Sequence, residues 1–159
     1  MTIYLSKNFT LDELLKTSYS GFKTKQLEEV KPFMSNLYIL ANYILQPIRD
    51  YYGVPVTITS GFRGVSLNKK VGGTETSDHT CIKGAAAADF TVKGKTVDQV
   101  FKDIISGKIG IYYRQVINEE NKSGSRWIHI STFRLPFDKN DKYMHKLKYD
   151  GKKYIEVKV

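Results

Sequence analysis

The chain has 159 residues, of which 41% are hydrophobic and 26% are charged, and it contains a single cysteine. This length and apolar fraction fit one compact domain and exclude a disordered chain, and the lone Cys81 excludes an internal disulfide scaffold. The first residues lack the apolar stretch of a secretory signal, and no segment approaches the roughly 20 apolar residues of a membrane span. The sequence therefore predicts synthesis in the cytosol without a signal peptide.

The net charge of +9 is concentrated in part at the C-terminus. The last 21 residues, from Lys139, hold seven lysines and three acidic residues. A field of this sign attracts polyanions such as nucleic acid or an anionic cell-wall polymer. Alternatively, the lysines protect a solvated strand edge from aggregation. Nucleic acid is the less favoured partner, because no aromatic and basic recognition motif is present.

The first third of the chain predicts helices. Thr10 and Glu13 have the spacing of a capping box, which predicts a short helix over residues 11–17. Apolar residues recur every three or four positions between Pro32 and Gly53, which predicts a long core helix. Pro47 lies inside that helix, and we expect it to cause a kink.

The next segments alternate between strands and helices. Residues 54–60 alternate apolar and polar side chains, which predicts a strand with one buried face. Pro55 favours either a sheet edge or the start of a strand. Residues 66–71 predict a short helix that Gly72 and Gly73 stop. A second strand over residues 86–92 and a helix from Thr96 to Gly107 follow.

Two antiparallel hairpins are predicted near the end of the chain. The runs 115–118 and 127–132 are rich in β-forming residues and are joined by a polar stretch. Asp150-Gly151 lies between residues 146–149 and 153–159, which predicts a two-residue turn with positive φ at its centre.

These elements predict one α+β domain in which helices pack on a small antiparallel sheet. Residues 1–138 form the body of the domain, and residues 139–159 form its basic C-terminal hairpin. No internal repeat, low-complexity tract or linker divides the chain.

Two histidines and one aspartate lie in surroundings typical of a functional site. His79 follows a Gly-Gly turn on a loop, and His129 shares one face of a β-rich run with Trp127 and Ser131. Asp89 lies within an apolar run, where an unpaired carboxylate is costly. Two histidines and one aspartate with an open fourth position suit catalytic zinc. A hydrogen-bonded histidine and an ordinary ion pair would account for the same residues.

The residues around these three form an ordered set of motifs from about Leu5 to Ser131. The set resembles the superfamily of zinc D-Ala-D-Ala carboxypeptidases and L-alanyl-D-glutamate endopeptidases. The resemblance implies a hedgehog-like α+β fold and zinc-dependent cleavage of peptidoglycan stem peptides, and many members of that superfamily are bacteriophage endolysins or virion proteins. The motifs are Ser60-Gly61-Phe62-Arg63, Leu67-Asn68, Val71-Gly72-Gly73, Thr76-Ser77-Asp78-His79, then Gly84 with an alanine run and Asp89, and finally Trp127-Ile128-His129.

The resemblance implies a role for each matching residue. His79, Asp89 and His129 would bind the Zn²⁺ ion. Arg63 would hold substrate or stabilise an oxyanion, and Ser77 would lie near the substrate. Otherwise Arg63 bridges loops and Ser77 only caps a turn.

The expected general base lies on the neighbouring β-rich run. Arg126, three residues before His129, cannot accept a proton. The run that ends in Glu119 resembles the family pattern, so Glu119 is the expected base and Glu120 is the alternative. Either residue could instead be a solvated acid of a hairpin.

The interval between the first two expected ligands is longer than in the family motif. Asp89 follows His79 by ten residues and Gly84 by five. An extra residue inside a strand would turn Asp89 to the other face of the sheet unless a bulge compensates. Cys81 lies in this longer interval, either as a replacement ligand or as a buried thiol.

Two functions follow from these observations. The first is a phage-encoded zinc peptidase that acts on peptidoglycan and stays in the host cytoplasm until lysis, or is carried in the virion. The second is a non-catalytic virion or cell-wall-binding protein that keeps the peptidase fold. Its partners would be peptidoglycan and other virion proteins.

Overall fold

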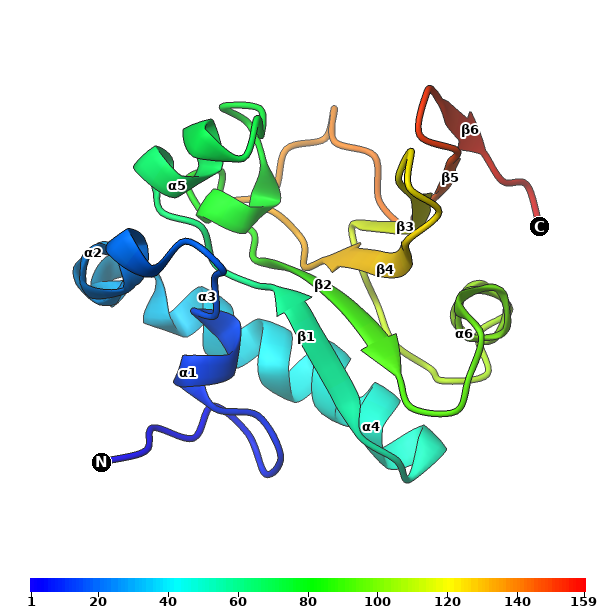
Figure 1. Ribbon diagram of the computed structural model, residues 1–159. Coiled ribbons are helices and arrows are strands. Elements are labelled where there is room, and N and C mark those ends of the chain that lie inside the picture. The colour runs from blue at the N-terminus through cyan, green and yellow to red at the C-terminus, as the bar shows by residue number, and fades with distance from the viewer.

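One six-stranded sheet organises the molecule. The computed structural model describes residues 1–159 and arranges the strands in the order β1-β2-β4-β3-β5-β6 (Figure 1). β1 lies at one edge, in agreement with the prediction from Pro55. The strands are β1 (Val56–Ser60), β2 (Ala87–Val92), β3 (Gln115–Glu120), β4 (Arg126–Ser131), β5 (His145–Tyr149) and β6 (Tyr154–Glu156).

The predicted helices are present, some of them shorter than expected, and one further helix, Lys23–Glu29, forms where no helix was predicted. Thr10 and Glu13 form the predicted capping box at the first helix. None of the helices combines the length and apolarity that crossing a membrane requires. They are α1 (Leu11–Leu14), α2 (Lys23–Glu29), α3 (Met34–Leu40), α4 (Gln46–Tyr52), α5 (Val65–Lys70) and α6 (Val97–Ile105).

The long helix predicted from Pro32 to Gly53 changes its hydrogen bonding where a kink was expected. α3 continues into a π-helical turn over Ala41–Leu45 and then into α4. The wider turn lies directly before Pro47, whose ring would clash with the carbonyl four residues earlier in a regular α-helix. The helix ends at Gly53, which has a φ of 65°.

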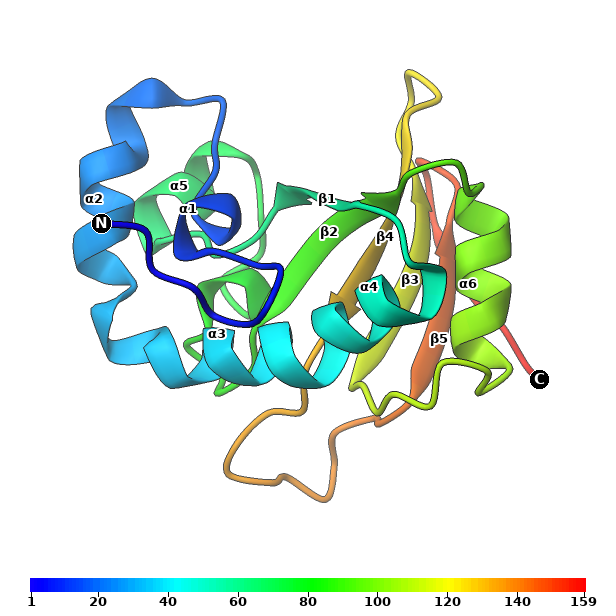
Figure 2. The same ribbon diagram turned by 90° about the horizontal axis from the view of Figure 1, so that it is seen from below.

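The hydrophobic core lies between the helices and one face of the sheet. Figure 2 shows α3 and α4 in front of the strands and α6 beside them. The opposite face of the sheet is therefore free to carry polar side chains. The core includes Val56, Ile58, Phe90, Val116, Ile128 and Ile130 from the strands and Leu37, Leu40, Ile44, Ile48, Phe101 and Ile104 from the helices.

Both predicted hairpins are present. β3 pairs with β4 and β5 pairs with β6, each in antiparallel fashion. The turn of the second hairpin lies one residue later than predicted, because the Asp150 N–H donates to the Lys153 carbonyl and puts Gly151 and Lys152 at the centre. The Asp150 carboxylate accepts hydrogen bonds from the N–H groups of Lys152 and Lys153, which fixes this register.

The α+β class is confirmed, but the sheet is mixed rather than wholly antiparallel. β5 runs parallel to β3, with Glu119 opposite Tyr149. A parallel pair needs a long connection, and residues 132–144 provide part of it after β4. The C-terminal hairpin therefore extends the central sheet and brings its side chains beside those of β3.

Candidate metal centre

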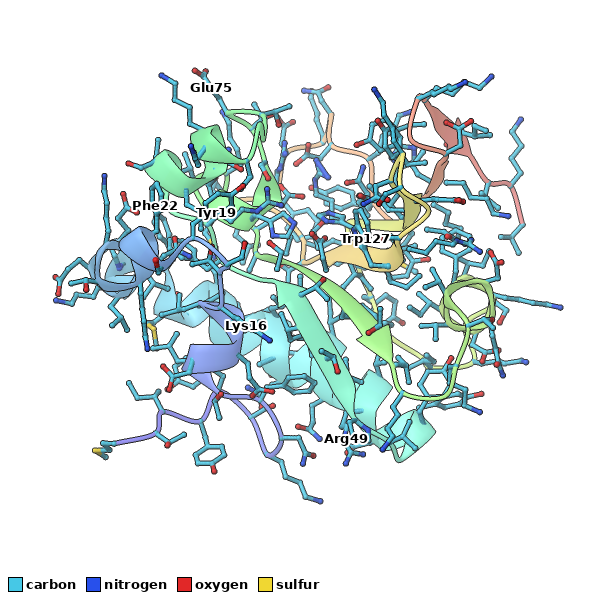
Figure 3. The ribbon with its side chains drawn as sticks, in the orientation of Figure 1. Lys16, Tyr19, Phe22, Arg49, Glu75 and Trp127 are labelled. Carbon is cyan, nitrogen blue, oxygen red and sulfur yellow. The ribbon has the colours of Figure 1, made fainter.

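A cleft of about 730 Å³ lies over the sheet face opposite the core. Every second side chain of a strand points to the same face, so neighbouring strands together form the floor of this cleft. Tyr19 and Trp127, both labelled in Figure 3, line this cleft. The floor residues, from β2 to β6, are Asp89, His129, Trp127, Ile117, Glu119, Tyr149 and Tyr154.

The longer interval before Asp89 does not turn its side chain away from the cleft. Asp89 of β2 lies directly opposite His129 of β4, so both side chains share one face. β2 begins only at Ala87, and the preceding loop absorbs the additional residues. A register shift occurs instead on the other side of β2, between Ile58 and Ser60 of β1.

Three potential ligand atoms converge on the cleft floor. His79 Nε2 lies 3.2 Å from His129 Nδ1, and Asp89 Oδ1 lies 3.2 Å from the former and 2.9 Å from the latter. Metal bonds of about 2.0–2.1 Å in a tetrahedral zinc site separate two ligand atoms by about 3.3 Å. The observed separations and the two-nitrogen, one-oxygen donor set therefore fit Zn²⁺. The structure brings together all three ligands that the resemblance implies.

The backbone of Gly61 orients the first of these ligands. His79 Nδ1 donates to the Gly61 carbonyl at 2.6 Å, which leaves the Nε2 lone pair directed at the other two ligands. Gly61 passes so close to the backbone of Leu14 that a Cβ atom at this position would collide with it. The next residue, Phe62, donates its N–H to the Leu14 carbonyl at 2.7 Å. α1 thus supports the loop that positions His79.

The buried amide of Gln26 holds the same loop from the other side. Its Nε2 donates to the Phe62 carbonyl at 2.7 Å, and its Oε1 accepts from the Gly64 N–H at 2.6 Å. These bonds fix the segment from which Arg63 reaches the cleft, where Arg63 Nη2 lies 3.9 Å from Asp89 Oδ2. Sequence reasoning missed Gln26, because a glutamine in a polar helical segment is usually exposed.

Asp78 anchors the turn that carries His79. The Asp78 carboxylate is buried and accepts from Arg134 Nε at 2.9 Å, and Arg114 Nη1 lies 3.2 Å away from it. Both arginines also line the cleft. Sequence reasoning missed this triad, and its only local signal is an aspartate directly before a candidate ligand.

The three candidate ligands differ in how their pKa values affect metal binding. Burial raises the pKa of Asp89, but the charge of His79 and hydrogen bonds from both histidines outweigh it and hold that pKa well below its usual range. Burial lowers the pKa of His79 despite the opposing effect of Asp89. Burial also acts to lower the pKa of His129, but Asp89 and Glu119 outweigh it and raise that pKa. Because a metal binds the unprotonated imidazole nitrogen, protons compete with a metal more strongly at His129 than at His79.

Of the two candidate bases, only Glu119 faces the cleft. Its burial raises the pKa of the carboxyl, Asp89 adds to the shift, and His129 and Arg63 oppose it. Glu120 points to the other face, and its carboxylate lies 3.8 Å from Arg126 Nε. Glu119 is thus the one of the two that lies near the three potential ligands.

Ser77 and Cys81 occupy different environments. Ser77 lines the cleft, and its hydroxyl accepts from the His79 N–H at 3.4 Å, so it also caps the turn. Cys81 is part of the hydrophobic core, and burial together with the charge of Asp78 raises the pKa of its thiol to about 12. The buried-thiol interpretation of Cys81 therefore holds, and the ligand cluster consists of His79, Asp89 and His129 alone.

A comparison with known families agrees with this site. A family model described as Peptidase M15 matches residues 7–131, which is more than half of the chain. The chain belongs to the peptidase M15 family. No curated protein matches it. The matched span contains the positions of His79, Asp89, His129 and Glu119 and ends before the C-terminal hairpin begins.

Proposed function

We propose that the protein is a zinc-dependent peptidase that cleaves the stem peptides of peptidoglycan. The convergence of His79 Nε2, Asp89 Oδ1 and His129 Nδ1 on the floor of an open cleft, in an M15 family chain, carries this proposal. These three side chains would hold Zn²⁺, and the cleft leaves room for substrate beside them.

The neighbouring side chains suit peptide hydrolysis. A bound zinc ion would supply a Lewis acid that lowers the pKa of a water molecule to about 7 and polarises an amide carbonyl. Glu119 would take a proton from the attacking water and pass it to the leaving amine, and its raised pKa suits both transfers. Arg63 would donate hydrogen bonds to the developing oxyanion or to a substrate carboxylate, and Ser77 would contact the substrate.

The charge of the molecule supports a cell-wall substrate. The net charge of +9 favours residence on an anionic wall, and Lys16 and Arg63 in the cleft suit the free carboxylates of stem peptides. The phage origin, and release at lysis or carriage in a virion, stay predictions from the resemblance.

Digestion of purified peptidoglycan tests this function. We expect the zinc-loaded protein to release peptide fragments, detected by mass spectrometry, and a chelator to abolish the release until zinc is restored. Glu119→Gln should keep its zinc and lose about 100- to 10,000-fold in kcat, whereas the matched variant Glu120→Gln should stay near wild type. If the zinc-loaded protein binds peptidoglycan and cleaves nothing, the non-catalytic alternative replaces this proposal.

A further inference from the structure

The C-terminal hairpin contributes two tyrosines to the cleft, beyond the last residue of the family match. Tyr149 of β5 is the cross-strand partner of Glu119, so the two side chains point to the same face. Tyr154 of β6 is in turn the partner of Tyr149. The two tyrosines continue the cleft floor away from the candidate metal centre, and we call them the tyrosine wall.

The two rings form one aromatic surface. Their centroids are 4.6 Å apart with an interplanar angle of 33°, so the Tyr149 ring supports that of Tyr154. Tyr154 is 59% exposed and can therefore meet a ligand. Burial and then the charge of Glu119 raise the pKa of the Tyr154 hydroxyl, which agrees with a ring that faces the acids of the cleft.

The strand spacing sets the distance between the tyrosine wall and the metal centre. β5 and β6 are two and three strands away from β4, which carries His129. Tyr149 and Tyr154 lie two residues, or about 7 Å, along the strands from the row that holds His129. With about 4.8 Å per strand across the sheet, they lie about 12 and 16 Å from His129. An extended peptide covers about 3.3–3.6 Å per residue, so these distances correspond to about three to five residues.

We infer that Tyr149 and Tyr154 bind the part of an extended peptidoglycan fragment that lies about three to five residues from the cleaved bond, an inference that rests on the proposed function. An aromatic face binds apolar C–H surface. In such a fragment this surface belongs either to a sugar ring or to a second, cross-linked peptide. The tyrosine wall thus selects long substrates over short ones, while the same metal centre acts on both.

Kinetics with three substrates test this inference. They are a short peptide with one residue on each side of the cleaved bond, a stem peptide that carries its disaccharide, and a sugar-free cross-linked peptide dimer. We expect Tyr154→Ala to raise KM about 3- to 10-fold for an extended substrate, to leave kcat unchanged, and to leave the short peptide unaffected. The extended substrate that responds identifies the bound group.

Matched variants separate ring contact from folding. Tyr154→Phe should behave as wild type, whereas Tyr154→Leu, which keeps an apolar side chain against Tyr149, should raise KM as alanine does while keeping the wild-type Tm. Tyr43→Ala is the control, because Tyr43 is 71% exposed and lies on the π-helical turn, outside the residues that line the cleft. Tyr43→Ala should change neither KM nor kcat.

Equal KM values for wild type and Tyr154→Ala on both extended substrates would overturn the inference. If the wild type cleaves none of the three substrates, the proposed function has failed instead. Calorimetric titration of the two extended fragments then tests whether the tyrosine wall binds them. A weaker Kd in Tyr154→Ala supports the inference, and equal Kd values for both fragments refute it.

Discussion

Among single residues, Gly61 has little freedom to change. Its carbonyl accepts from His79, and an added Cβ would meet the Leu14 backbone. We expect Gly61→Ala to lower the free energy of unfolding by about 1–3 kcal/mol, because the loop must move away from α1. Urea denaturation measures this loss. Gly21→Ala is the control, since nothing lies within 4 Å of a Cβ added at this position. Equal free energies of unfolding for the two variants would show that the contact between Gly61 and Leu14 does not constrain the loop.

Asp89 should control metal-dependent stability. A ligand that binds only the folded state at about 1,000 times its Kd stabilises that state by about 4 kcal/mol. We expect zinc to raise the Tm of the wild type and of Asp12→Asn, but not that of Asp89→Asn. Because protonation of His129 competes with zinc binding and the pKa of His129 is raised, zinc affinity should fall as the pH drops through that pKa. Thermal unfolding and elemental analysis measure both effects, and a zinc-dependent Tm in Asp89→Asn would refute the ligand assignment.

At the scale of elements, Asp98 attaches α6 to the sheet. Its carboxylate accepts from both Arg126 Nη atoms at 2.8–2.9 Å and from Asn118 Nδ2 at 2.8 Å. These hydrogen bonds lower the pKa of Asp98 to about 2. Since this pKa lies below the ordinary value of about 3.9, the ionised Asp98 stabilises the folded state above about pH 4. This stabilisation is lost as the pH falls through about 2.

Removal of the Asp98 charge should therefore change the acid sensitivity of the fold. We expect Asp98→Asn to lower the free energy of unfolding by less than about 1 kcal/mol at neutral pH, because Asp98 is exposed. Between about pH 4 and pH 2, the free energy of unfolding of this variant should decline less steeply than that of the wild type. Urea unfolding across this pH range measures the difference. A decline identical to that of the wild type would show that these hydrogen bonds contribute no stability.

The elements that the sequence predicted correctly depend on local patterns. The periodicity of residues 32–53 and the alternation of residues 54–60 survive in the structure, because each reflects burial of one face of a single element. The three potential ligands were likewise found from motifs. The parallel pairing of β3 with β5 and the burial of Gln26 were missed, because both arise from contacts between segments far apart in the chain.

At the scale of the whole molecule, the basic surface should control attachment to a polyanion. Lys152 and Lys153 are exposed at the turn of the C-terminal hairpin. We expect the double variant Lys152→Gln/Lys153→Gln to elute from a column of anionic wall polymer at lower salt than the wild type, with an unchanged Tm.

A second pair of lysines provides the control for this elution. Lys69 and Lys70 are adjacent and exposed on α5, so Lys69→Gln/Lys70→Gln removes the same charge elsewhere on the surface. If both double variants elute at the same salt concentration, only the net charge matters and the hairpin has no special role.

The hydrogen bond from Phe62 to Leu14 has a consequence for local opening. When α1 detaches, the Phe62 amide loses its hydrogen-bond acceptor. The neighbouring Gly61 carbonyl, which accepts from His79, is then no longer held in place by α1. Zinc binding and closure of α1 should therefore be thermodynamically coupled, so zinc should slow hydrogen exchange at the Phe62 amide. A hydrogen bond between two backbone segments would thus report the occupancy of the metal centre.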